Sequence, residues 1–413
     1  MSTRVVHITG GVPVESVAHA GGVFQRDVTR SLLDQGFEVL VLAPAHRGNR
    51  ADLPDSIAPR TSLPEDWLRR RSLADFAVRA AHRLNRWAYG STAQYSHPPF
   101  VVSLLLQPRA WHALRHADVI DLQWFAQIRL LPLIRLIAGR RPQIIGTFHD
   151  VVSQRVERTA AITEDARTRE RIRKTARRLR RTERRLGRHL DQSIVLSEKD
   201  RDLLIDAGVP ERRVSVLAPR FVVPERDSGS SGRGLATSSP VVLFVGYLGR
   251  SENADAVRWL LEEIWPLLSR LEPGAELRIV GGGAPEDLCR IVGKAPGVAA
   301  VGYVDDLWAE YLRADCCIIP IRDGAGVKFK TIEALLSGTP TVSTPIGAEG
   351  VGRAEDYVAV SDDPKELANA IRSAINDPMH RRRAEETAER LARLHDSRTF
   401  ELTVRHLYGS QSE

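Results

Sequence analysis

The chain has 413 residues, of which 43% are hydrophobic and 27% are charged, and its formal net charge is +7. The length predicts two domains, the composition indicates a globular protein with buried cores, and the positive charge favours anionic partners such as nucleotides, phospholipid headgroups or nucleic acid. No stretch reaches the roughly 18 consecutive apolar residues of a membrane-spanning helix, which excludes a chain built from such spans.

The first half of the chain alternates short β-branched runs with amphipathic helical patterns. Its first apolar run is too short for a signal peptide and leads directly into structure, so we expect a buried strand there. Helical patterns cover residues 22–35, 101–115 and 155–189. This alternation, with nearly continuous apolar strands, predicts a parallel sheet covered on both faces. The expected strands are residues 4–10, 37–44, 118–123, 142–150, 192–197 and 213–219.

Two Arg-rich helical patterns carry much of the positive charge. The helix expected at residues 64–90 could lie on an anionic membrane or bind a lipid-linked acceptor, but packing of its apolar stripe on its own domain is the favoured interpretation. In residues 167–189, arginine and glutamate are interleaved with almost no aromatic side chain, which argues against nucleic acid as a partner. The stripe of the first helix consists of Leu73, Phe76, Ala80, Leu84 and Trp87.

Residues 223–240 are rich in Gly, Ser and Pro and lack periodicity, which predicts an exposed linker. The strand and helix alternation then restarts, so we expect one Rossmann-like domain over residues 1–222 and a second over 241–395. A C-terminal helix within 396–413 is expected to pack back on the first domain. The strands expected in the second domain are residues 241–246, 276–281, 297–302, 315–320, 339–344 and 357–360, with helices at about 254–270, 285–293, 306–314 and 327–338.

The stretch GAGVKFKTIEALLSG, residues 324–338, is the strongest candidate for a binding site. Ligands of doubly wound sheets bind beyond the carboxyl ends of the strands, and with two domains a cleft between them is the simplest location. Gly324 and Gly326 would let backbone N–H groups approach a ligand, and the N-terminus of the following helix favours an anion such as a diphosphate. Lys330 and Glu333 share one helix face, so the cation can meet phosphate while the acid accepts from a sugar hydroxyl. The alternative is a surface ion pair.

Three further features lie where ligands of such folds bind. Gly21 and Gly22 open the helix after the first strand and offer donors to phosphate, although they do not form a GxGxxG pattern and could form only a tight turn. His149 ends a strand, where it could contact a reacting hydroxyl or phosphate or merely cap a loop. Arg250 follows the first strand of the second domain and suits bidentate phosphate contact, unless it is an ordinary surface arginine.

Taken together, these motifs resemble the group 1 glycosyltransferases, family 4 of the GT-B enzymes. VVLFVGYLGR, LRIVGGG and VGYVDDLWAEYLRADCCIIP follow one another in the family's order, and GAGVKFKTIEALLSGTPTVSTPIGAEGV is similar to its most specific signature. The resemblance covers nearly the whole chain, with residues 45–100 diverged, a region that forms acceptor-side structure in such enzymes. It implies an α/β GT-B fold with two tandem Rossmann-like doubly wound domains, the first on the acceptor side and the second binding the nucleotide sugar, and an inter-domain cleft.

The resemblance also implies residue roles. Glu333 matches the acid that holds the donor's ribose hydroxyls, Lys330 lies where the family binds the diphosphate and the transferred sugar, and His149 matches the cleft histidine near that sugar. These three are the expected catalytic residues. The expected donor-binding residues are Gly21, Gly22, Arg250, Tyr303, Val304, Gly324, Ala325, Gly326 and Val327.

The sequence departs from the family pattern at three positions. The family often carries a second acid eight residues before the ribose-binding one, and that position is Ala325 here. A common arginine is replaced by Tyr247, and a usual lysine falls at about Asn253. Arg250 could supply the lost charge. We interpret these departures as a subgroup difference in how the donor sugar is held and not as loss of activity.

The resemblance therefore implies a retaining glycosyltransferase that moves a sugar from a nucleotide diphosphate, with UDP favoured, to a hydroxyl acceptor such as a glycan, a lipid-linked saccharide or a small natural product. Apart from the nucleotide sugar as co-substrate, no cofactor or metal is expected. Three cysteines, two of them adjacent at Cys316 and Cys317, argue against a disulfide framework and for the cytoplasm, with peripheral contact at the inner face of the plasma membrane as an option. The alternatives are a UDP-sugar 2-epimerase-like enzyme and a non-catalytic GT-B partner protein.

Overall fold

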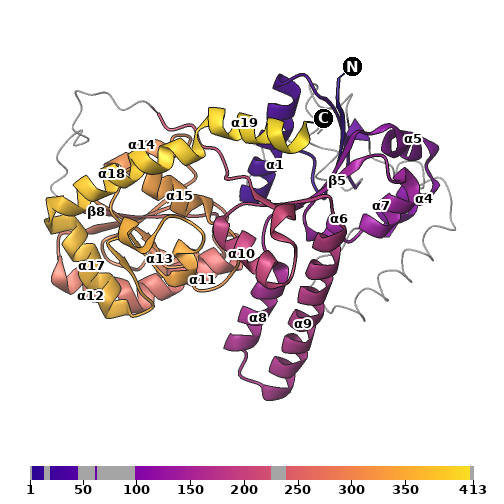
Figure 1. Ribbon diagram of the computed structural model, residues 1–413. Coiled ribbons are helices and arrows are strands. Elements are labelled where there is room, and N and C mark those ends of the chain that lie inside the picture. Colours follow the sequence, from indigo (N-terminus) through magenta and orange to yellow (C-terminus); the bar gives the residue numbers. More distant parts are fainter. Residues whose placement is uncertain (1, 14–18, 45–60, 63–97, 225–238, 410–413) are drawn as a thin grey trace. The chain divides into compact units, whose positions relative to one another are not determined.

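The structure, a computed structural model, describes residues 2–13, 19–44, 61–62, 98–224 and 239–409. The chain divides into two compact units: unit 1 comprises Met1–Arg220 and Arg398–Glu413, and unit 2 comprises Phe221–Ser397 (Figure 1). The helix expected at 64–90 and most of the linker expected at 223–240 lie outside the described residues. Among the helices that are described, none is long and apolar enough to cross a membrane.

Unit 1 is built on a seven-stranded sheet in the order β3-β2-β1-β4-β5-β6-β7. All neighbouring strands are parallel, and β4 is buried along its whole length, as a central strand covered on both faces must be. The strand order reverses between β1 and β4, so the carboxyl ends of these two strands form the topological switch point where ligands bind. The strands are β1 (Arg4–Ile8), β2 (Glu38–Leu42), β3 (Thr61–Ser62), β4 (Val119–Gln123), β5 (Gln143–Phe148), β6 (Gln192–Val195) and β7 (Val214–Val216).

The helices of unit 1 pack their apolar residues on this sheet around a core that includes Ile8, Leu122 and Phe148. The last helix, α19, belongs to unit 1 although it follows the whole of unit 2 in the chain. The helices are α1 (Ala20–Asp34), α4 (Pro98–Leu106), α5 (Pro108–His116), α6 (Phe125–Ile128), α7 (Leu131–Ala138), α8 (Val152–Ile162), α9 (Ala166–His189), α10 (Glu198–Asp206), the 3₁₀ turn η3 (Glu211–Arg213) and α19 (Ser397–Tyr408).

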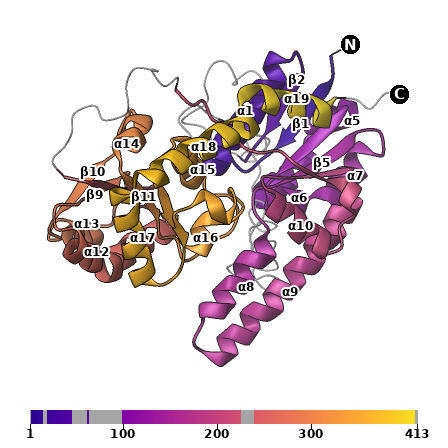
Figure 2. The ribbon, with the colours of Figure 1, turned by 60° about the vertical axis from the view of Figure 1, so that its left-hand side comes forward.

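Two helices expected from the sequence are each interrupted. The pattern at 101–115 forms α4 and α5, because Pro108 cannot donate a backbone hydrogen bond and begins a new helix. The pattern at 155–189 forms α8 and α9, which run side by side as a helical hairpin (Figure 2). Asp165 caps α9 by accepting from the Thr168 N–H at 2.7 Å. The buried Glu183 of α9 accepts from the Ser153 N–H at 3.0 Å and so ties the hairpin together.

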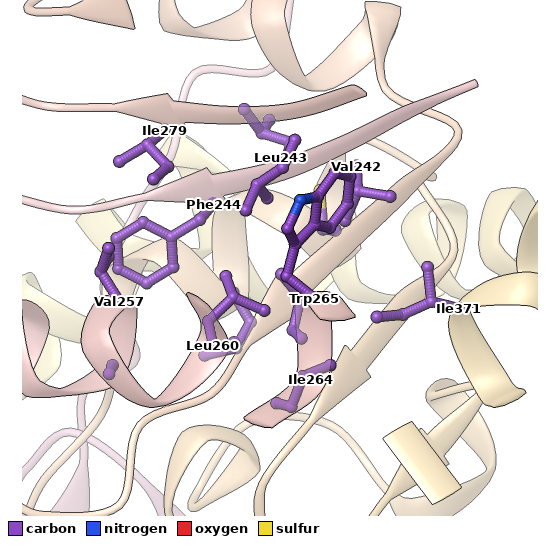
Figure 3. Close-up of a cluster of buried hydrophobic side chains, with 14 of the residues drawn as sticks. Val242, Leu243, Phe244, Val257, Leu260, Ile264, Trp265, Ile279 and Ile371 are labelled. Atoms are coloured by element: carbon purple, nitrogen blue, oxygen red, sulfur yellow. The ribbon is translucent and has the colours of Figure 1, made fainter. Parts of the chain in front are cut away.

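Unit 2 is built on a six-stranded sheet in the order β10-β9-β8-β11-β12-β13, again with parallel neighbours. Its switch point lies between β8 and β11, where the order reverses. Side chains of β8 and of the helices that cover it meet in one apolar cluster, in which Phe244 lies near Val257 and Ile279 (Figure 3). The strands are β8 (Val241–Val245), β9 (Glu276–Val280), β10 (Val298–Gly302), β11 (Cys316–Ile319), β12 (Thr341–Ser343) and β13 (Ala359–Val360).

The helix after β8 contains a π-helical turn, η4 (Leu260–Ile264), between α11 (Ser251–Trp259) and α12 (Trp265–Leu271). Pro266 is the second residue of α12, and because proline lacks an N–H and crowds the preceding turn, the wider turn accommodates it. The remaining helices are α13 (Glu286–Val292), α14 (Leu307–Arg313), α15 (Phe329–Leu336), α16 (Pro345–Ala348), the 3₁₀ turn η5 (Ala354–Asp356), α17 (Pro364–Asn376) and α18 (Pro378–His395).

Each unit by itself is thus a doubly wound α/β domain, which confirms the predicted fold class. The cleft expected between the two domains stays a prediction.

Candidate functional site

In unit 2, the loop from β11 to α15 carries the glycines that the sequence singled out. Gly324 and Gly326 have φ angles of 114° and 72°, a region that only glycine enters without strain. The Gly324 N–H donates to the Asp323 carboxylate at 2.7 Å, so this donor already has an acceptor. The helix begins at Phe329, two residues later than expected, and no side chain caps its first turn. The start of α15 is therefore suited to receive an anion from outside the chain.

Lys330 lies in the first turn of α15 and is largely enclosed by protein. Its Nζ donates to Asn253 Oδ1 at 2.5 Å and lies 5.1 Å from the centre of the Phe244 ring. Burial lowers the pKa of Lys330 to about 7, and the nearby positive charge of Arg250 acts in the same direction. Because the lysine is held by a neutral amide, its charge is not cancelled by a salt bridge.

Gly246, directly after β8, makes room for this lysine. A Cβ at Gly246 would lie 2.8 Å from Lys330 Nζ, a distance that real Cβ atoms do not show. Asn253 is fixed in turn, since its Nδ2 donates to the Tyr247 carbonyl at 2.7 Å. Asn253, which the sequence marked only as a departure from the family pattern, is thus the group that positions Lys330.

Glu333 lies one turn after Lys330 on the same helix. Its carboxylate accepts from the Tyr311 hydroxyl at 3.1 Å, and burial raises its pKa. Lys330 bonds to Asn253, so the surface ion pair between Lys330 and Glu333 that the sequence left open is not what the structure shows. A half-buried carboxylate with a neutral partner can accept further hydrogen bonds from a ligand's hydroxyl groups.

The other candidates in unit 2 differ in their surroundings. Arg250 is more than half exposed and pairs with Glu252 at 2.5 Å. Tyr303, just after β10, is 81% exposed, and the adjacent Val304 packs against the core. Ala325 and Val327 lie half-buried in the loop before α15. The loop from β11 to α15 is further tied by an ion pair between the partly buried Lys328 and Glu349 at 3.5 Å, which sequence reasoning missed.

In unit 1, His149 follows β5 beside the switch point and is buried. Its Nε2 lies 2.8 Å from Gln123 Oε1, and its ring stacks on Trp124 with centroids 3.7 Å apart and planes 10° apart. The Phe24 ring meets it edge-on at 5.6 Å. Burial, and to a lesser degree the nearby His19, lower the pKa of His149 to about 3, so the imidazole is neutral at physiological pH.

Gly21 and Gly22 lie in the first turn of α1, as expected, but each has a structural task. The Gly22 N–H donates to His19 Nδ1 at 3.0 Å, which caps the helix. A Cβ at Gly21 would lie 2.0 Å from the Trp124 ring, so only glycine allows this tryptophan to approach α1. Trp124 was missed by sequence reasoning, and it is the only residue other than glycine with positive φ, at 78°, in the described part of the chain.

The candidate residues thus form one group at the switch point of each unit: His149 with Gly21 and Gly22 in unit 1, and Lys330 with Glu333 in unit 2. No group of three or more His, Cys, Asp or Glu that could hold a metal ion is found in the described ranges.

Two family models match most of the chain. The family described as "Glycosyltransferase Family 4" matches residues 21–219, and the family described as "Glycosyl transferases group 1" matches residues 239–377. The first range contains His149, and the second contains Lys330 and Glu333.

Relatives and solved structures extend the comparison. A protein from the cps region of Klebsiella pneumoniae is 33% identical over 132 residues, which is 30% of this chain and 34% of the relative. A glycogen synthase of Mycobacterium tuberculosis is 31% identical over 173 residues, or 39% of this chain and 41% of the synthase. The chain therefore matches well under two thirds of the length of either. The crystal structure of HepE from Anabaena in complex with UDP and glucose superposes with a TM-score of 0.65, covering 98% of this chain and 99% of HepE at 15% identity, which shows a shared fold.

Proposed function

Because the chain belongs to the group 1 glycosyltransferases, we propose that it is a retaining glycosyltransferase of family 4. It moves a sugar from a nucleotide diphosphate to a hydroxyl group of a glycan, a lipid-linked saccharide or a small natural product. UDP is the favoured nucleotide, which is supported by the UDP and glucose bound to HepE, a protein of the same fold.

The observation that carries the proposal is the pairing of one cation with one acid on the first turns of α15. Lys330 and the uncapped helix start provide positive potential for a diphosphate, while Glu333 provides acceptor oxygens for ribose hydroxyls. Tyr303 and Val304 are proposed to meet the base. Arg250 would have to leave Glu252 to reach a phosphate, and an exposed ion pair contributes only about 0–1 kcal/mol, so this exchange costs little.

In the proposed reaction, the bond between the anomeric carbon and the leaving diphosphate oxygen breaks. A bond from the acceptor oxygen to the same face of the sugar forms, and the acceptor proton passes to the leaving phosphate oxygen. Lys330 and the N-terminus of α15 stabilise the negative charge that develops on the diphosphate, which is the main electrostatic requirement of this step. His149 is proposed to contact the transferred sugar. Lys330 supplies the cation at the leaving group, so we propose that no metal is needed and expect EDTA to leave activity unchanged.

Calorimetry with UDP, GDP and ADP tests the donor site without knowledge of the acceptor. One nucleotide, expected to be UDP, should bind clearly. Glu333→Ala should weaken that binding by about 1–3 kcal/mol, because a half-buried acceptor for ribose is lost. Lys365→Met, on the exposed face of α17, serves as a charge-removing control and should bind like the wild type. Binding by none of the three nucleotides would contradict the donor-site assignment.

The reaction itself is tested by mass analysis of products from UDP-sugars offered with polysaccharide, lipid-linked and small-molecule acceptors. A product that gains one sugar supports the proposal. Free sugar epimerised at C2 in the absence of an acceptor would instead identify a 2-epimerase, and nucleotide binding without turnover would identify a non-catalytic partner. We place the reaction in the cytoplasm, in agreement with the three free cysteines, and contact with an anionic membrane is tested by sedimentation with vesicles.

A further inference from the structure

A chain of buried hydrogen bonds in unit 1 runs from the end of α19 to His149. The Tyr408 hydroxyl donates to Asp121 Oδ2 at 2.6 Å, although the two residues are 287 positions apart in the sequence. Gln123 Nε2 donates to the same carboxylate oxygen at 2.6 Å, and Gln123 Oε1 lies 2.8 Å from His149 Nε2. Thr147 donates to the other oxygen of Asp121 at 3.0 Å. Asp121, Gln123, Thr147 and Tyr408 are all fully buried, so water does not compete for these bonds.

The direction of each bond follows from the chemistry of the carboxylate. An ionised Asp121 can only accept, so the amide nitrogen of Gln123 must face it, and the amide oxygen must face His149. An amide oxygen can only accept, so His149 Nε2 must carry the proton. In a neutral imidazole the other nitrogen, Nδ1, is then a bare acceptor. That atom is buried and has no hydrogen-bond partner among the described residues.

The ring is also fixed in position by apolar contacts that lead back to α19. His149 lies between the face of Trp124 and the edge of Phe24, and the Phe24 ring meets Phe400 of α19 edge-on at 6.2 Å. Gln35 of α1 donates to the Glu401 carbonyl at 3.0 Å, which holds α19 against α1. One helix thus supports His149 through a polar route by Tyr408 and an apolar route by Phe400.

One further titratable group, His7, faces this chain of hydrogen bonds. His7 Nε2 lies 3.6 Å from Asp121 Oδ2, and burial lowers the pKa of His7. A neutral His7 leaves the negative charge of Asp121 to be satisfied by Tyr408, Gln123 and Thr147, which keeps the amide of Gln123 in the orientation described.

We propose that Tyr408, Asp121 and Gln123 are positioning residues that hold His149 as the Nε2–H tautomer, so that it meets its ligand only as a hydrogen-bond acceptor at Nδ1. The ligand group at this point must then be a donor, such as a hydroxyl. The identification of that hydroxyl with a sugar rests on the proposed function, whereas the tautomer does not.

The tautomer is measured directly by long-range ¹H–¹⁵N NMR on the full-length protein labelled at histidine, with His149 assigned from a His149→Gln variant. The wild type should show a protonated Nε2 and a bare Nδ1, without titration between pH 5.5 and 8. Gln123→Met keeps the length of the side chain but removes the amide, and should yield a mixture of tautomers. Tyr408→Phe removes only the hydroxyl at the far end of the chain of hydrogen bonds. It should therefore give an Nδ1–H tautomer population that is above that of the wild type but smaller than that of Gln123→Met. Ser103→Ala, which deletes a fully buried hydroxyl bonded to the Phe100 carbonyl within α4, is the matched control and should leave the wild-type signal.

A second readout is the release of UDP from UDP-glucose with water as the acceptor. Gln123→Met should lower kcat about tenfold with little change in KM, as expected when one hydrogen bond that orients a reacting partner is lost. An Nδ1–H tautomer in the wild type, or an unchanged tautomer in Gln123→Met, would overturn the proposal. So would a Tyr408→Phe spectrum identical to that of Ser103→Ala. If the tautomer behaved as expected while UDP, GDP and ADP all failed to bind, the positioning of His149 would stand and the proposed function would fail.

Discussion

Each unit places a nitrogen base near the switch point of its sheet, His149 after β5 and Lys330 in the helix after β11, yet the two bases are prepared for different tasks. His149 in unit 1 lies between aromatic rings and is tied through an amide to a buried carboxylate, so it is neutral and its donor side is fixed. Lys330 in unit 2 has one neutral partner, Asn253, and lies in the first turn of an uncapped helix, so it can be charged. The comparison shows that the topology determines near which strand ends each base lies. The immediate partners of the base determine whether it accepts a hydrogen bond, as His149 does, or attracts an anion, as Lys330 does.

The largest expected effect is on UDP affinity, and it should distinguish Lys330 from His149. Lys330→Met should weaken UDP binding by about 10- to 100-fold, because a hydrogen bond to a charged partner contributes about 1.5–3 kcal/mol. His149→Gln should leave the affinity for UDP nearly unchanged, since UDP lacks the transferred sugar that His149 is proposed to contact. Calorimetry checks both variants, and a larger loss in His149→Gln than in Lys330→Met would reverse the assignment.

Replacing one glycine in each unit by alanine shows why the backbone at each candidate site requires glycine, and the free energy of unfolding measures the cost. Gly21→Ala should lower the free energy of unfolding by about 1–3 kcal/mol, because its Cβ would collide with Trp124 and force the ring off His149. Gly324→Ala should cost about 1–2 kcal/mol for a different reason: among the described residues, no atom beyond those of its chain neighbours lies within 4 Å of the added Cβ, but the φ of 114° is unfavourable for alanine.

Urea unfolding measures both changes, and the NMR signal of His149 distinguishes them. Only Gly21→Ala should alter that signal, because Trp124 stacks directly on the His149 ring. An altered His149 signal in Gly324→Ala would show that the two groups are not independent.

The smallest expected effect is a pH dependence that belongs to unit 2 alone. The pKa of Lys330 is about 7 in the free protein, so its charge is largely present at pH 6 and largely absent at pH 8. A bound diphosphate favours the charged form, and UDP-glucose affinity should therefore fall by about tenfold from pH 6 to pH 8. UDP-glucose is the suitable probe because its diphosphate, esterified at both ends, keeps a constant charge over this range.

In Lys330→Met this pH dependence should disappear. His149 has a pKa of about 3 and should contribute nothing between pH 6 and pH 8. A pH dependence that persists without Lys330 would point to another titrating group in the donor site.

The sequence predicted the fold class and the main candidate residues because both depend on local patterns. Alternating strand and helix periodicity determines the parallel sheets, and Lys330 and Glu333 lie three residues apart on one helix, so their common face follows from helical geometry alone. The breaks at Pro108 and Asp165 had local signals too, a proline at the first helical position and an N-cap aspartate.

What the sequence did not predict are contacts between distant segments. Asp121 and Tyr408 are joined across 287 positions, and no periodicity links them. The Trp124 ring lies where a Cβ at Gly21, in a different element, would collide with it, so its place depends on a residue about 100 positions away in the sequence. Asn253 was visible as a departure from a motif, but its bond to Lys330 depends on the register between β8 and β11.

The place of α19 in unit 1 has a consequence for the order in which the protein folds on the ribosome. Domains generally fold as units from the N-terminus while the chain is being made. Here residues 398–413 of unit 1 are synthesised only after all of unit 2. The nascent first domain must therefore wait, with Asp121 and Phe24 still lacking Tyr408 and Phe400, until translation has passed the second.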